Sequence, residues 1–187
     1  MRNLLPLMAV SLAISMPAVA AESVGVPGFR SVELRGGGNV TLRRGPLQRV
    51  IITSGSSAYT QFRVVRNGQL KIDACNDRCP RHYNLEILIE SPRVPDVAVT
   101  GGGNINVAPG FAAQPNLAAA VTGGGRIDTR PVGVSSVSAA VSGGGLIVTN
   151  AMSSLHAAVS GGGSIRYTGN PRVSSAVQGG GAVSRVR

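Results

Sequence analysis

The sequence contains no tryptophan, and aromatic residues make up only 3% of its 187 positions. Any packed interior must therefore be built from valine, isoleucine, leucine and alanine. Charged residues account for 14% and hydrophobic residues for 43%. This balance excludes an intrinsically disordered chain, because disorder requires low hydrophobicity and high charge density. Many of the 26 glycines occur in triplets rather than at every third position, which excludes a collagen helix.

Side chains that usually carry out catalysis are also scarce, since the chain has two histidines and eight acidic residues. Asp128 is the only acidic residue after Asp96. Enzymes that cleave polysaccharides need paired or clustered carboxylates, and repeat calcium sites need an aspartate in every coil. His82 and His156 each stand alone. We therefore predict a protein that is not an enzyme, with no catalytic residue, no metal site and no cofactor.

The first twenty residues have the pattern of a secretory signal peptide. A positive leader, Met1–Asn3, precedes an apolar run from Leu4 to Met16, and Ala18–Ala20 forms a small-x-small cleavage site. The apolar run is shorter than the roughly 20 residues needed to span a bilayer, and no later segment is long enough. We expect cleavage near Ala20, which leaves a mature chain without a transmembrane segment in the periplasm, or at the surface, of a bacterium.

The two cysteines, Cys75 and Cys79, are separated by three residues in a polar segment. An even number of cysteines in an exported chain favours a disulfide. A metal site would need ligands beyond the nearby His82, and a redox pair of the thioredoxin type would have the spacing C-x-x-C. We predict a disulfide that closes a small loop and contributes about 2 kcal/mol or less to stability.

A repeat dominates the second half of the chain. Each copy has an alternating apolar stretch, a glycine triplet, and an isoleucine or valine two residues later. The triplets begin at Gly101, Gly123, Gly143, Gly161 and Gly179, so they are 22, 20, 18 and 18 residues apart. A diverged earlier copy has its triplet at Gly36. A period in this range is typical of solenoid proteins.

Apolar residues alternate within each copy. Leu117, Ala119 and Val121 share one side of the chain, and Ile127 begins a second alternating run after the triplet. A period of two is typical of β-strands. A coil of two or three short strands cannot bury its apolar face alone, so successive coils must stack. We predict an all-β fold, a single-stranded parallel β-helix or solenoid, right-handed by the crossover rule, with coils of 18–22 residues.

The glycine triplets are expected to form the corners of the coils, where φ is positive and neighbouring coils leave no room for a Cβ atom. Gly144, inside the array, is expected to tolerate no side chain for this reason. The predicted corner glycines are Gly36, Gly37, Gly38, Gly101, Gly102, Gly103, Gly123, Gly124, Gly125, Gly143, Gly144, Gly145, Gly161, Gly162, Gly163, Gly179, Gly180 and Gly181.

The first half of the mature chain is less regular. Strands are expected at residues 50–52, 61–65, 69–74 and 85–90. Arg66–Gly68 is typical of a β-hairpin with a two-residue turn. Pro92 and Pro95 mark a boundary. We therefore predict an irregular β part that includes a cap over residues 21–94, and regular coils over residues 95–187.

Several of these segments resemble a known family. They are Phe29–Leu34, Gly37–Leu42, Gly68–Ile72, Ile89–Pro92 and the repeated V-[ST]-G-G-G-x-I. Together they resemble the DUF2807 family, also named the putative auto-transporter adhesin head, or GIN, domain, over almost the whole mature chain. The resemblance implies a β-helical domain of the bacterial envelope with an adhesin-like role. Its motifs are structural and transfer no active-site residue.

Two surfaces are candidates for binding. Small side chains before the triplets stack into columns and predict a flat contact face of Ala98, Ala120, Ala140, Ala158, Ala176, Thr100, Thr122, Ser142 and Ser160. The formal net charge is +10 and nearly all of the basic residues are arginine, which prefers planar anions. Arg43 and Arg44, the only adjacent arginines after the leader, are candidate contacts for an anion.

We predict an exported envelope module that acts in binding, adhesion or structure. Binding of an anionic glycan or lipid through arginine is the alternative, and a polysaccharide-active enzyme is less favoured. A nucleic-acid partner is disfavoured because no aromatic side chains interleave with the basic ones. The last coil is expected to pair with a second copy or an envelope protein, or to repel such pairing through Arg185 and Arg187.

Overall fold

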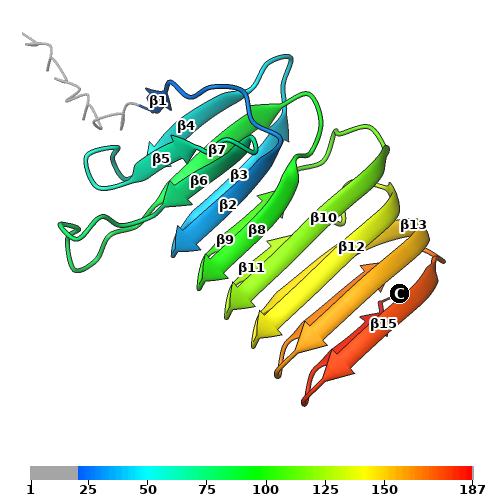
Figure 1. The fold of residues 1–187 in the computed structure, drawn as a ribbon. Coiled ribbons are helices and arrows are strands. Elements are labelled where there is room, and N and C mark those ends of the chain that lie inside the picture. The colour runs from blue at the N-terminus through cyan, green and yellow to red at the C-terminus, as the bar shows by residue number, and fades with distance from the viewer. Residues whose placement is uncertain (1–20, 187) are drawn as a thin grey trace, which may run out of the picture.

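The computed structural model describes residues 21–186 of the chain. These residues form sixteen β-strands and no helix (Figure 1), which confirms the all-β prediction. The expected signal peptide, residues 1–20, and the expected edge residue Arg187 lie outside the described residues.

The strands in chain order are β1 (Glu22–Val24), β2 (Ser31–Gly36), β3 (Asn39–Arg44), β4 (Arg49–Ser54), β5 (Gln61–Val64), β6 (Gln69–Asp73), β7 (Glu86–Ser91), β8 (Asp96–Gly101), β9 (Asn104–Val107), β10 (Gln114–Gly123), β11 (Arg126–Asp128), β12 (Val134–Gly143), β13 (Leu146–Ser160), β14 (Ser164–Thr168), β15 (Arg172–Gln178) and β16 (Ala182–Arg185).

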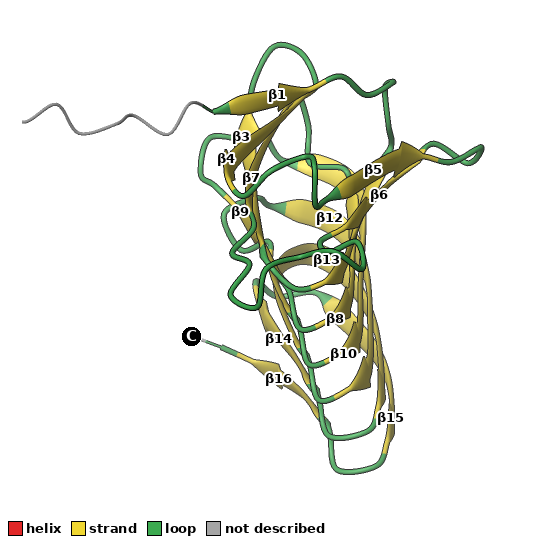
Figure 2. Ribbon diagram, turned by 90° about the vertical axis from the view of Figure 1, so that its left-hand side faces the viewer, coloured by secondary structure: helices red, strands yellow, loops and turns green. Residues whose placement is uncertain are grey.

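The strands pair into two ladders. The first ladder has the order β1-β4-β7-β3-β9-β11-β13-β14-β16. The second has the order β5-β6-β2-β8-β10-β12-β13-β15. The long strand β13 belongs to both, because its first residues pair in the first ladder and its last residues in the second. Figure 2 shows the ladders as two walls joined by turns.

Alternating side chains build the core between these walls. In β10, Leu117, Ala119 and Val121 are at most 2% exposed, whereas Ala120 and Thr122 are exposed. The opposite wall contributes one isoleucine per coil, two residues after each triplet: Ile105, Ile127, Ile147 and Ile165, each 0% exposed. Full burial of such a side chain stabilises a fold by about 1.5–3 kcal/mol, so each added coil brings its own share of core.

The first glycine triplet continues the same ladders. β2 and β3, which flank Gly36–Gly38, pair with β8 and β9 on either side of Gly101–Gly103. The chain between β3 and β8 forms β4 to β7, which extend both ladders at the N-terminal end. Two stacked coils are therefore separated in sequence by an insertion of four strands.

The predicted hairpin is present, but its turn is longer than two residues. The N–H of Val65 donates to the carbonyl of Gln69 (2.9 Å), and the N–H of Gly68 donates to that of Val65 (2.8 Å). Gly68 has a φ of 74°, and among residues 21–186 only glycines have a positive φ. The two-residue turn that Asn-Gly favours would need a positive φ at Asn67 as well, so the prediction of a two-residue turn is wrong.

Cys75 and Cys79 form the predicted disulfide, with their Cα atoms 5.8 Å apart. Within this loop, the N–H of Asn76 donates to the carbonyl of Tyr59 at 2.7 Å. Tyr59 in turn lies edge-on to the ring of Tyr83. The disulfide loop is thus fastened to the segment that precedes β5, beside the N-terminal end of the ladders.

The last strand of the second ladder is open to solvent. Every residue of β15 is exposed. Val173 and Val177 are 40% and 43% exposed, although they occupy the same columns as the buried Leu155 and Val159. The pairing of this coil with another chain stays a prediction.

Only two glycines of each triplet are sterically restricted. Gly143 has a φ of 110°, and a Cβ there would lie 2.8 Å from the carbonyl oxygen of Gly123. A Cβ on Gly145 would lie 2.4 Å from Cγ1 of Val121, whereas a Cβ on Gly144 would meet no atom within 4 Å. The expectation for Gly144 is therefore wrong, because the middle residue of the turn faces open space. The other open middle glycines are Gly37, Gly102, Gly124, Gly162 and Gly180.

This contrast predicts that alanine substitutions at two glycines of one triplet lower the free energy of unfolding by different amounts. Gly145→Ala should lower the free energy of unfolding by about 1–3 kcal/mol, because its Cβ overpacks the contact between coils. Gly144→Ala should change it by no more than about 0.5 kcal/mol. Urea unfolding followed by circular dichroism measures both, and equal midpoints for the two variants would contradict the stacked turn.

Candidate binding surfaces

Outward-facing residues of the second ladder form three rows that cross the strands. In-register pairing of β8, β10, β12, β13 and β15 aligns them. The alanine row is Ala98, Ala120, Ala140, Ala158 and Ala176. The hydroxyl row is Thr100, Thr122, Ser142 and Ser160, and the amide side chain of Gln178 continues it on β15. The mixed row is Asp96, Ala118, Ser138, His156 and Ser174. Neighbours in a row are about 4.8 Å apart, and adjacent rows are about 7 Å apart.

The structure thus places all of the predicted contact-face residues on one surface, and this surface is hollowed. A shallow groove of about 660 Å³ follows the alanine row and the mixed row. We call this groove, with the hydroxyl row along its other side, the alanine trough. Asp96 and His156 are the only titratable residues in the groove lining. The Asp96 carboxylate accepts a hydrogen bond from the N–H of Ala118 at 2.8 Å.

Next to the trough, toward the N-terminal end, the same face becomes charged. Glu33 lies 3.5 Å from Nζ of Lys71 and 3.8 Å from Nε of Arg35. Asp73 lies 3.3 Å from Arg35 and 3.1 Å from Arg63. Exposed pairs of this kind contribute at most about 1 kcal/mol each. Their effect on the surface is to balance charge on β2, β5 and β6, outside the groove.

Arg43 and Arg44, the predicted anion contacts, lie at the end of β3 in the first ladder. Nη2 of Arg43 is 2.7 Å from Oε1 of Glu90. Nη1 of Arg44 donates to the carbonyl of Gly110 at 3.3 Å. The two arginines therefore have separate partners, and only Arg43 is balanced by a carboxylate.

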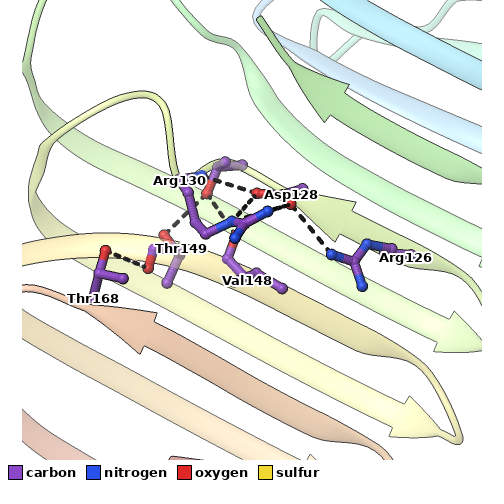
Figure 3. A network of polar contacts seen from close by, with 7 residues as sticks. Arg126, Asp128, Arg130, Val148, Thr149 and Thr168 are labelled. Atoms are coloured by element: carbon purple, nitrogen blue, oxygen red, sulfur yellow. Dashed lines mark hydrogen bonds and ion pairs between the residues drawn. The ribbon is translucent and has the colours of Figure 1, made fainter. Parts of the chain in front are cut away.

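A cluster that the sequence analysis missed lies on the outer side of β11 (Figure 3). Nη2 of Arg130 donates to Oδ2 of Asp128 at 2.6 Å, and Nε of Arg130 donates to Oδ1 of Asp128 at 2.9 Å. Nη2 of Arg126 donates to Oδ2 of Asp128 at 3.3 Å. Behind it, buried Thr129 donates to Oγ1 of Thr149 at 3.0 Å. The pattern R-x-D-x-R was the available signal, because alternate residues of a strand share a face.

The arginines decide the ionisation of Asp128. Burial raises the pKa of this carboxyl, but hydrogen bonds and the charge of Arg130, with a further hydrogen bond from Arg126, outweigh burial and hold the pKa below its usual value. The cluster therefore keeps a buried carboxylate charged and paired. Its chemistry is that of a structural contact, since both arginines are directed at the one carboxylate.

No group of three or more His, Cys, Asp or Glu side chains in the described part of the chain could hold a metal ion. Within residues 21–186 there is also no helix long and apolar enough to cross a membrane.

Comparisons with known proteins give a family and a fold. The DUF2807 family model, described as "Putative auto-transporter adhesin, head GIN domain", matches residues 28–114 and 96–171. No curated protein matches the chain. A solved "putative adhesin" from Bacteroides fragilis is 20% identical, with a TM-score of 0.57 over 89% of this chain and 96% of that one. This likeness shows a shared fold.

Other solved structures are more distant. A "putative cell adhesion protein" from Clostridium sporogenes is 11% identical, with a TM-score of 0.44 over 89% of this chain and 98% of that one. A "putative lipid binding protein" from Parabacteroides distasonis is 16% identical, with a TM-score of 0.39 over 90% and 96%.

The lowered pKa of Asp128 predicts how stability depends on pH. The stabilising contribution is complete above the pKa of Asp128 in the unfolded chain and is lost as the pH falls through the lower folded-state value. Thermal unfolding between pH 7 and pH 2 should show this loss. Asp128→Asn should lower the stability at pH 7 and should remove the part of the pH dependence that comes from Asp128. Asp77→Asn in the exposed disulfide loop is the control, and an identical pH profile for both variants would refute the assignment.

Proposed function

The chain belongs to the DUF2807 family, and from this premise we propose that it is an exported, non-catalytic binding module of the bacterial envelope. In this proposal the two ladders are the walls of a right-handed parallel β-solenoid, and the outer face of the second ladder is the contact surface. The family description and the name of the similar Bacteroides fragilis protein, both of which refer to adhesins, support a role in binding.

The strand pairing supports the solenoid. Each coil contributes one strand to each wall, and equivalent residues pair directly, as in the series Ala98, Ala120, Ala140 and Ala158. Stacked coils that contact only their neighbours are the defining feature of solenoid proteins, which commonly use the extended surface of the stack for binding.

The geometry of the polar groups supports a role without catalysis. His156 lies in the mixed row between Ser138 and Ser174, but the only carboxylate of that row, Asp96, is three strands away, about 14 Å. A nucleophile, its base and the group that orients the base must lie within hydrogen-bond reach of one another. The other carboxylate of the later coils, Asp128, is bound by two arginines.

The exposed alanine row is the observation that carries the proposal. Methyl groups that repeat across five neighbouring strands form a continuous apolar surface rimmed by polar side chains, and such surfaces mark interaction sites. The sequence pattern of the leader and the Cys75–Cys79 disulfide support export, because disulfides persist in oxidising compartments.

Binding through this face can be tested with one substitution. Ala140→Glu places a charged side chain at the centre of the alanine row and should abolish binding of the labelled mature protein to isolated bacterial envelopes. Ala112→Glu, at an exposed position outside the trough, makes the same change and should leave binding intact. The measurement is the bound fraction after sedimentation, in 50 mM and in 500 mM salt.

The same assay separates the arginine-based alternative. If Ala140→Glu binds like the unchanged protein, and binding collapses in high salt or on substitution of Arg44 by alanine, then charge carries the interaction and the proposed contact face is wrong.

A further inference from the structure

The floor and the two rims of the alanine trough differ in chemistry. The floor is a line of methyl groups that extends over four strand spacings, about 19 Å. The rims are the hydroxyl row and the mixed row, about 13 Å apart. Among the described residues, Thr100 is the one member of the hydroxyl row whose side chain is engaged, since its Oγ1 donates to Glu33 at 3.1 Å. Thr122, Ser142 and Ser160 remain available to a ligand.

The backbone hydrogen-bonding groups of this face are already paired between neighbouring strands. β10, β12 and the end of β13 pair on both sides, so a ligand lying on the face must be held by side chains. An extended peptide on the methyl floor would lose water from its own amide groups without gaining partners for them, which is costly. An acyl chain would find a floor but would lie between two hydrophilic rims.

A sugar chain has the matching distribution of groups. The faces of a pyranose ring carry C–H bonds, which suit a methyl floor, and its equatorial hydroxyls project sideways toward the rims. The length of one ring is similar to the strand spacing, so successive sugars meet successive strands along the trough.

The charge of the lining selects against an anionic chain. Asp96 and His156 are the only titratable groups there, and the carboxylate of Asp96 would repel an anion. No arginine lines the groove: Arg35, Arg63 and Arg43 pair with carboxylates outside it, and Arg172 lies on β15 two residues before Ser174, outside the mixed row. A chain without charge is therefore the complementary occupant.

We infer that the alanine trough binds a linear, uncharged polysaccharide whose chain crosses the strands along the alanine row. The inference rests on the proposed function and names its ligand class. The C–H faces of the sugars lie on Ala120, Ala140 and Ala158, and their hydroxyls bond to the hydroxyl row and to Ser138, His156 and Ser174.

The test is a calorimetric and NMR titration of the mature protein with three neutral hexasaccharides: cellohexaose, chitohexaose and β-1,4-mannohexaose. At least one should bind and shift backbone amide signals of β10, β12 and β13. Ala140→Leu, which fills the floor without adding charge, should weaken binding by about tenfold or more. Thr122→Val, which removes one rim hydroxyl and keeps the shape, should weaken it by about three- to tenfold.

Matched controls are Ala112→Leu, outside the trough, and a heparin hexasaccharide as the anionic probe. The inference is overturned if none of the neutral hexasaccharides binds at millimolar concentration, if Ala140→Leu or Thr122→Val binds as well as the unchanged protein, or if only the heparin fragment binds. It is also overturned if light scattering shows a dimer that Ala140→Leu dissociates, because a second copy then covers the trough.

The two proposals fail in different ways. Loss of envelope binding in Ala140→Glu together with no binding of neutral hexasaccharides removes the ligand class and keeps the contact face. Envelope binding that is unaffected by Ala140→Glu removes the contact face itself.

Discussion

Stacking of backbone on backbone at the glycine turns is the constraint on which the structure depends. The N–H of Gly144 donates to the carbonyl of Gly123, and the N–H of Leu146 to that of Gly125, both at 3.0 Å. This approach leaves no space for a Cβ on the first or third glycine of the triplet. A slip by one residue would place a side chain in that contact and would turn every strand's apolar side outward. The register of one coil therefore sets the register of the next.

Because the register is fixed, a residue type that repeats at the same position of every coil forms a row on the surface. Inward positions must fill a narrow core, so valine, leucine and isoleucine recur there, with the small Ala119, Ala139 and Ala157 between them. Outward positions have no such demand, yet alanine recurs at Ala120 and Ala140 and onward. A repeated small residue at an exposed position is not explained by packing within the coil, and this is why the outer face, rather than the core, indicates function.

Local periodicity made most of the fold predictable. Alternation around each triplet predicted the strands and the columns, because both depend on residues close in sequence. The insertion of β4 to β7 between stacked coils was not predictable, since it depends on pairing between distant segments. The freedom of Gly144 was missed because a triplet looks uniform in sequence, whereas only its outer members face the next coil. The Asp128 cluster was not predicted from the sequence because it contains a single carboxylate between two arginines, whereas catalytic and metal sites are recognised by several carboxylates close together.

All acidic residues of the described chain except Asp96 lie outside the lining of the alanine trough. Glu33, Asp73, Glu90 and Asp128 each lie within 4 Å of an arginine or lysine, and none of them lines the groove. Because the net charge is strongly positive, the field of the whole molecule attracts anionic envelope surfaces from a distance and weakens with salt. In the proposed function the trough acts only on contact, through methyl groups and hydroxyls that salt does not screen. The proposed function therefore assigns approach to the envelope and selection of a ligand to different parts of the surface.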